Sequence, residues 1–80
     1  MEYQVEVRVS LKKGVLDAEG ETVQKSLSLL GFRISRVETV KTYVITVDAG
    51  SEDAAVKTVE DACQRLLANP VIQEYSITVV

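Results

Sequence analysis

Side chains suited to catalysis are scarce in this chain. The sequence contains no histidine and a single cysteine, Cys63, so neither the usual general base near neutral pH nor a Cys-His nucleophile pair can form within it. Cys63 falls in the middle of a helical pattern, on or near its apolar stripe, which indicates a small buried thiol. The Cys and His ligands typical of zinc sites are missing as well. These observations favour a non-catalytic domain.

Phosphate and nucleic-acid chemistry is also not indicated. The carboxylates are scattered over helix starts and strand faces, with no apparent pair in a pocket. A net charge of −3 and a pI near 4.8 argue against nucleic acid as the main partner. The aromatic residues fall at core-type positions rather than on a base-stacking face. The four glycines form no phosphate-binding loop: Gly14, Gly20, Gly31 and Gly50.

The length of 80 residues predicts one small domain, residues 1–80. A chain this short buries only about 60% of its unfolded surface, so its stability is marginal, and association with itself or a partner is one common remedy. Cys63 has no partner for a disulfide within the chain, which fits a reducing compartment, and we expect a cytoplasmic protein. The start leads directly into a strand pattern, so we expect no signal peptide. No apolar run approaches the roughly 20 residues that span a membrane.

The first half of the chain predicts a strand, a helix and two further strands. Residues 3–11 alternate apolar and polar side chains strictly, which is typical of a strand with one buried face. Asp17 is suited to cap a helix that ends before Gly31, and Phe32 is expected to pack back on the helix end. Gly20 lies in the first turn, where close approach by another backbone is its usual justification. Residues 34–41 predict a weaker strand, edge-like or bulged, and 42–47 a better one.

The second half predicts a helix and a last strand. Ser51 is a plausible N-cap for a helix that runs to about Ala68. Pro70 forces the helix to stop, and Asn69 tolerates the left-handed turn that closes many helices. A strand follows from about residue 72 to 80. The turn between 34–41 and 42–47 must be tight and near Lys41, although it lacks the Asn-Gly or Asp-Gly typical of hairpins.

This order predicts an α+β fold: a ferredoxin-like βαββαβ two-layer sandwich with an antiparallel four-stranded sheet and two helices on one face. The opposite face would carry small polar side chains from the even-numbered positions of the strands. It could be a solvated face, or either this face or an edge strand could be a surface that joins another chain. A fold of this type hosts many functions, so it does not settle the role of the chain.

Two stretches resemble a known family. Residues 11–20, Leu-Lys-Lys-Gly-Val-Leu-Asp-Ala-Glu-Gly, resemble the Leu-Lys-Pro-Gly-Val-Leu-Asp-Pro-x-Gly motif of the PurS family. Residues 66–72, Leu-Leu-Ala-Asn-Pro-Val-Ile, are similar to the helix-stop segment of that family. Leu30-Gly31-Phe32 and Cys63 also fall where the family places them. The resemblance covers essentially the whole chain.

The resemblance implies a role in purine biosynthesis. PurS is the small subunit of phosphoribosylformylglycinamidine synthase, a glutamine amidotransferase complex. It would bridge the synthetase subunit PurL, which uses ATP and Mg, and the glutaminase subunit PurQ, which releases ammonia from glutamine. The chain itself would carry no cofactor and no catalytic residue, and it would form a homodimer or tetramer with no nucleic-acid or membrane partner.

The chain departs from the family pattern at three places. The two prolines of the first motif are Lys13 and Ala18 here, so the loop is expected to be looser. The Arg-x-Gly-Lys of the family hairpin is Glu-Thr-Val-Lys here, and only Lys41 remains.

We expect the loop from Lys12 to Gly20 and the corner at Asn69-Pro70 to contact partner subunits. The alternative to partner contact is a purely structural role, in which Asp17 only caps a helix and Pro70 only ends one. Reversing the charges of Lys12 and Lys13 should weaken assembly without disturbing the fold. The candidate partner-binding residues are Lys12, Lys13, Gly14, Asp17, Gly20, Lys41, Asn69 and Pro70.

A second hypothesis is a regulatory ligand-binding module of the amino-acid-sensing type, which shares this order of elements. Such modules are usually fused to an enzyme, whereas this chain shows no linker. A thermal shift on addition of amino acids or nucleotides would distinguish the two hypotheses.

Overall fold

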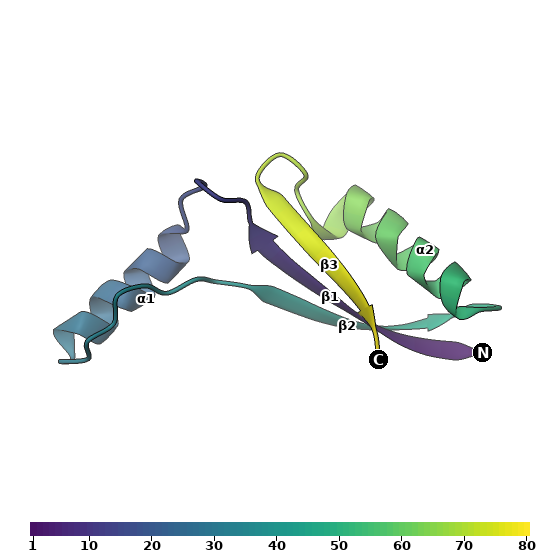
Figure 1. The fold of residues 1–80 in the computed structure, drawn as a ribbon, viewed down its shortest axis with the longest axis horizontal. Coiled ribbons are helices and arrows are strands. Elements are labelled where there is room, and N and C mark those ends of the chain that lie inside the picture. Colours follow the sequence, from purple (N-terminus) through teal and green to yellow (C-terminus); the bar gives the residue numbers. More distant parts are fainter.

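The computed structural model describes all 80 residues, and most of them form a sheet covered by one helix (Figure 1). Strand β1 (Glu2–Leu11) is central, with β2 (Lys41–Asp48) on one side and β3 (Gln73–Val79) on the other. Both neighbours run antiparallel to β1. Helix α2 (Glu52–Ala62) crosses one face of the sheet and continues into a π-helical turn, η1 (Cys63–Leu67). We call these elements the body.

The core of the body lies between β1 and α2. Alternation places the odd-numbered residues of β1 beneath the helix, where Val5 and Val7 are fully buried. Ala55, Val59 and Cys63 follow at intervals of four residues and face them. The prediction of a buried thiol at Cys63 is therefore confirmed. Eight of the 80 residues are buried, which is a small core even for a chain of this length.

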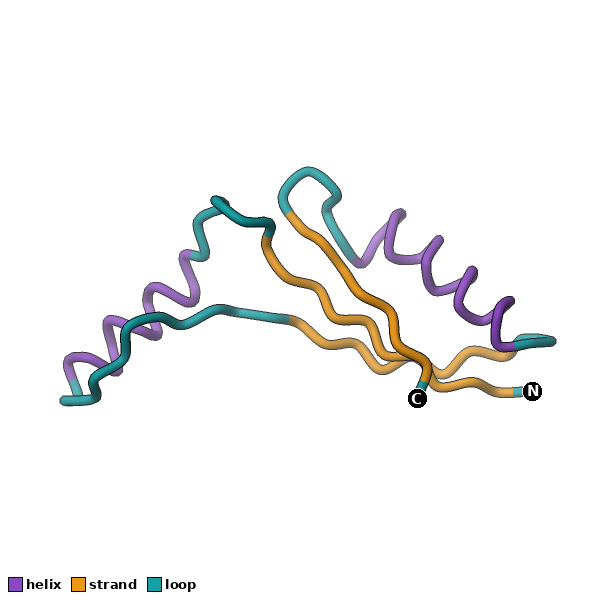
Figure 2. Tube along the Cα trace, viewed as in Figure 1, coloured by secondary structure: helices purple, strands orange, loops and turns teal.

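The remaining helix, α1 (Ala18–Leu29), does not cover the sheet. It projects from one end of the body and returns through residues 32–40, which run extended beside it without joining a strand (Figures 1 and 2). We call α1 and residues 30–40 the arm. The chain measures 52 × 24 × 14 Å with a radius of gyration of 16.1 Å, whereas a compact chain of 80 residues has about 12 Å.

Three details of the predicted fold are therefore wrong for the single chain. The sheet has three strands instead of four, one helix covers it instead of two, and no hairpin forms near Lys41. Residues 36–42 contain no glycine, proline, asparagine or aspartate, which tight turns require. This segment instead carries Val37, Thr39, Val40 and Thr42, whose branched side chains favour extended backbone. The chain therefore runs straight where a hairpin would bend.

The helix ends follow the sequence closely, with two exceptions. Gly31 has φ +96°, and the bonds from Phe32 N–H to the Leu27 carbonyl and from Gly31 N–H to the Ser28 carbonyl, both 3.1 Å, close α1 in a Schellman motif. Phe32 nevertheless remains 58% exposed instead of packing on the helix. Ser51 caps α2 as predicted, through Ala54 N–H at 3.2 Å.

The predicted left-handed residue at Asn69 is wrong, because only glycines have positive φ in this chain. The backbone becomes extended at Ala68, and the side chain of Asn69 stabilises the turn that follows. Its Oδ1 accepts Val71 N–H at 3.0 Å, while its carbonyl accepts the N–H of Gln73 at 2.7 Å. Neither helix has the length and the apolar run that spanning a lipid bilayer would demand.

Candidate partner interface

The apolar side of α1 has no counterpart in its own chain. Val23, Leu27 and Leu30 recur at helical spacing, the pattern of a helix that packs against a core. Yet Val23 is 43% exposed and Leu30 74% exposed. In solution a small protein rarely leaves such a stripe open, because each apolar side chain gains about 1.5–3 kcal/mol on full burial.

The body has a matching incomplete side along β2. Tyr43, Ile45 and Val47 of β2 pack against the core cluster but remain only half-buried, although α2 contacts β2. In the predicted sandwich α1 would lie over these residues. The structure thus has an unpacked helix in the arm and a row of half-buried apolar side chains on β2.

The outer edge of β2 is also free for pairing. Ala49 N–H donates to the Met1 carbonyl at 2.9 Å, so in this register the odd-numbered residues of β2 bond to β1. The N–H and C=O groups of Thr42, Val44 and Thr46 therefore point away from the sheet. An unpaired strand edge of this kind is a template for a strand from another chain.

Asp17 links the start of α1 to the segment that returns toward β2. We call this place, formed by Asp17, Gly20, Val37 and Thr39, the neck. One oxygen of its carboxylate, Oδ1, accepts Gly20 N–H at 2.9 Å and caps α1. The other, Oδ2, accepts Thr39 N–H at 2.6 Å. These two backbone donors lower the pKa of Asp17 below its ordinary value, with the Gly20 bond the larger cause.

Gly20 is in the neck because no side chain fits there. A Cβ on this residue would collide with the carbonyl oxygen of Val37, so the returning segment can approach the first turn of α1 only over a glycine. The expected close approach of another backbone is confirmed. One turn farther along, Gln24 Nε2 donates to the Ile34 carbonyl at 2.9 Å. The arm is therefore a unit with its own internal bonds.

The structure brings together the two surfaces that the sequence proposed. Lys12 Nζ donates to the Pro70 carbonyl at 2.6 Å, and Lys12 N–H donates to the Ile72 carbonyl at 2.9 Å. The Lys12 loop and the Asn69-Pro70 corner are thus one surface at the end of β1 and β3. We call it the corner surface. Val71, 78% exposed, adds an apolar side chain beside this corner.

The loop keeps a defined turn even without the prolines of the family motif. Val15 N–H donates to the Lys12 carbonyl at 3.1 Å, and Gly14 at the third position has φ +88°. These are the features of a type II turn, in which proline is favoured at the second position. Lys13 occupies that second position and bears an exposed side chain. Lys41, the remaining candidate residue, is exposed at the start of β2 opposite Val9, away from any turn.

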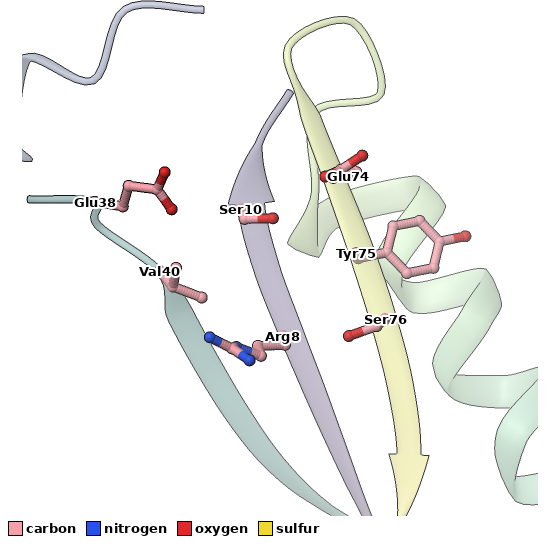
Figure 3. A pocket seen from close by; sticks show the side chains of 7 residues that line it. All are labelled: Arg8, Ser10, Glu38, Val40, Glu74, Tyr75 and Ser76. Atoms are coloured by element: carbon pink, nitrogen blue, oxygen red, sulfur yellow. The ribbon is translucent and has the colours of Figure 1, made fainter. Parts of the chain in front are cut away.

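The largest hollow lies on the open face of the sheet and is about 350 Å³ (Figure 3). Arg8, Ser10 and Ser76 point into it from β1 and β3, with Glu38 and Glu74 at its borders. Arg8 forms no ion pair, and Glu38 pairs instead with Arg36. No cluster of three His, Cys, Asp or Glu side chains has the geometry for a metal ion. Sequence reasoning placed Arg8 and Ser10 on this face but did not foresee that Glu38 would border it.

Comparison with known proteins decides the family. Residues 4–80 match the family model described as PurS, phosphoribosylformylglycinamidine (FGAM) synthase. The chain belongs to the PurS family. The PurS subunit of Methanothermobacter thermautotrophicus is 43% identical over 79 residues, covering 99% of this chain and 94% of the relative. That of Archaeoglobus fulgidus is 49% identical over 73 residues, covering 90% and 91%.

Solved structures of PurS subunits share the whole shape of this chain. A PurS subunit of FGAM synthetase with 43% identity superposes over 96% of this chain and 92% of its own, with a TM-score of 0.90. A chain of the PurLQS structure from Thermotoga maritima, 27% identical, covers 100% and 99% with a TM-score of 0.89. Agreement over nearly the full length includes the arm, so its outward pose is common to these proteins. The amino-acid-sensing hypothesis finds no support among these relatives.

Proposed function

We propose that this chain is the non-catalytic small subunit of phosphoribosylformylglycinamidine synthase and bridges its synthetase, PurL, and its glutaminase, PurQ. The observation that carries the proposal is membership of a family with a relative solved as part of a PurLQS assembly. The ATP and Mg of the reaction belong to the synthetase. Bridging would keep the ammonia released by the glutaminase from escaping to solvent.

The side chains of the chain agree with a bridging role. A bridge needs surfaces rather than reactive groups, and this chain has exposed surfaces at both ends of an elongated shape. Its one thiol, Cys63, is buried, and burial together with the charge of Glu60 raises the pKa of that thiol. A thiol held in its neutral form is a poor nucleophile.

The test is amidation by the cognate PurL and PurQ, with and without this chain. We expect activity from glutamine to require the chain, while activity from added ammonium does not, because ammonium supplied in solution need not be transferred from PurQ. Equal glutamine-dependent activity without the chain would contradict the bridging role. A requirement with ammonium as well would indicate that the chain acts on PurL itself rather than on ammonia transfer.

We further propose that a second copy of the chain completes the four-stranded sandwich. Residues 33–40 of one copy would pair with the free edge of β2 in the other, and α1 would cover the half-buried residues of β2. The eight residues 33–40 match the eight residues of β2 in length. Each copy would then contribute its arm to the domain of its partner, so residues 1–80 make one PurS-like domain only in the pair.

The surface area supports this exchange. The chain exposes 6084 Å², whereas a compact monomer of 8.8 kDa exposes about 4,800 Å². The excess of about 1,300 Å² per chain exceeds the roughly 800 Å² that each partner buries in a standard stable interface. Sedimentation at micromolar concentration should therefore show a dimer or a multiple of it. A monomer would contradict the exchange without bearing on the amidation test.

The corner surface is our candidate for contact with the other subunits, since exchange of the arms would leave it uncovered. Its residues are Lys12, Lys13, Gly14, Asn69 and Pro70. Lys13→Glu reverses a charge that makes no bond in the chain, so loss of complex formation would report on contact with a partner. Lys12→Glu is less informative, because it also breaks the bond to the Pro70 carbonyl. Lys57→Glu, on an exposed part of α2, is the matched control. Unchanged assembly of Lys13→Glu would count against the surface.

We place this complex in the cytoplasm, where the unpaired Cys63 would stay reduced.

A further inference from the structure

The register of the sheet shows that the neck interrupts a ladder that could have continued. Strands β1 and β2 pair from Glu2 with Asp48 to Val9 with Lys41. Hydrogen bonds in this ladder join the odd-numbered residues, as the bond from Ala49 N–H to the Met1 carbonyl shows. The next such pair would be Leu11 with Thr39. In a continuous ladder, Thr39 N–H would donate to the Leu11 carbonyl.

Thr39 N–H donates instead to Asp17 Oδ2, at 2.6 Å. A carboxylate is a stronger acceptor than a backbone carbonyl, and hydrogen bonds to charged groups are roughly twice as strong as neutral ones. The bond therefore diverts the chain from the ladder two residues before β2 begins. Gly20 makes room for the diverted segment, because any Cβ there would meet the Val37 carbonyl.

We propose that Asp17 is the residue that sets where the sheet ends and the arm begins, and that it holds residues 33–40 in the pose that a second copy accepts. Its capping bond to Gly20 and its bond to Thr39 tie the start of α1 to the end of the returning segment. Without the second bond, Thr39 would be free to extend the ladder with Leu11, and the arm would lose its fixed direction. Asp17 thus acts as a positioning residue for self-association. This inference rests on the proposed exchange of arms.

The informative variant is Asp17→Asn. Asparagine is as good an N-cap as aspartate, so the bond from Gly20 N–H and the start of α1 should survive. The charged acceptor for Thr39 is lost. We expect faster amide exchange at Thr39, unchanged protection in the middle of α1, and a dissociation constant of the dimer raised about tenfold or more, as befits loss of a charged hydrogen bond in each copy.

The matched control is Ser51→Ala, which removes a cap of the same kind from α2 without touching the neck. It should weaken α2 while leaving the Thr39 amide unchanged. If Asp17→Asn keeps the exchange rate of Thr39 and the dissociation constant of the unaltered chain, the inference fails. If the unaltered chain is monomeric, the exchange of arms fails, but the Thr39 amide still reports whether Asp17 diverts the strand.

Discussion

The body and the arm contain similar apolar side chains but use them differently. In the body, Val5, Val7 and Val59 are fully or almost fully buried within one chain. In the arm, Gly20 is the one buried residue, and every leucine of the stripe remains partly or largely open. A hydrophobic pattern therefore indicates that a residue will be buried, but it does not indicate which chain will bury it. This difference supports our proposal that a second copy of the chain covers the arm.

The strongest test of this difference is to place a charge in the body and, separately, in the arm. Val59→Asp puts an unpaired carboxylate in the core, at a penalty of several kcal/mol, against a stability of about 4–12 kcal/mol for a domain of this size. We expect it to abolish folding. Val23→Asp places the same charge on the arm, and we expect a folded body that no longer self-associates. Circular dichroism and sedimentation distinguish the two outcomes. An unfolded Val23→Asp chain would show that the body does not fold stably without the arm of a partner.

A turn at the start of β2 should convert exchange between copies into closure within one chain. Glu38→Asn combined with Thr39→Gly supplies the Asn-Gly pair typical of a two-residue hairpin, flanked by Val37 and Val40. Val40 falls at an even-numbered position of the β2 register, so its N–H and C=O point away from β1 and can pair with Val37. The expected product is a monomer in which residues 33–37 pair with their own β2. Sedimentation would show the monomer, and amide protection in residues 33–37 would show the closed strand. A dimer with the original protection would mean that the hinge sequence does not control closure.

Restoring the prolines of the family motif should stabilise the neck modestly. Ala18 is the first residue of α1, and Asp17 before it has φ −99° and ψ 85°, outside the helical region that a following proline disfavours. Ala18→Pro should therefore raise the free energy of unfolding by about 0.4–1 kcal/mol, and Lys13→Pro should act similarly in its type II turn. Denaturant unfolding measures both. Ala54→Pro is the control, and it should destabilise, because Ala54 N–H donates to Ser51.

The smallest expected effect is a weakening, at acid pH, of the hydrogen bond from Thr39 N–H to the carboxylate of Asp17. The folded pKa of Asp17 is lowered, so its contribution is fully present above its unfolded pKa of about 3.9 and is lost as pH falls through the lower folded value. Amide exchange at Thr39, corrected for its intrinsic pH dependence, should lose protection in that window. Asp17→Asn should show no such acid loss. An identical acid profile in both chains would assign the effect to other carboxylates.

Much of the local structure was predictable because it depends on neighbouring residues. Asp17 and Ser51 cap the helices, Gly31 closes α1 and Gly20 admits a second backbone, as residue type and position indicated. Asn69 was misread, since its side chain bonded to the backbone offered an alternative to the left-handed turn. Of the candidate surface, Lys12 and Pro70 are 58 residues apart in sequence, and no local pattern could show that they are hydrogen-bonded.

The amino-acid sequence by itself determined the three strands of the sheet, the two helices and the caps at Asp17 and Ser51, because each depends on propensity and spacing over a few residues. The strand and the tight turn predicted for residues 34–41 did not form. The tertiary structure alone decided that α1 and residues 33–40 lie away from the sheet. That choice depends on a competition for Thr39 N–H between the carboxylate of Asp17 and the carbonyl of Leu11. Such a competition involves groups that only the folded backbone brings together.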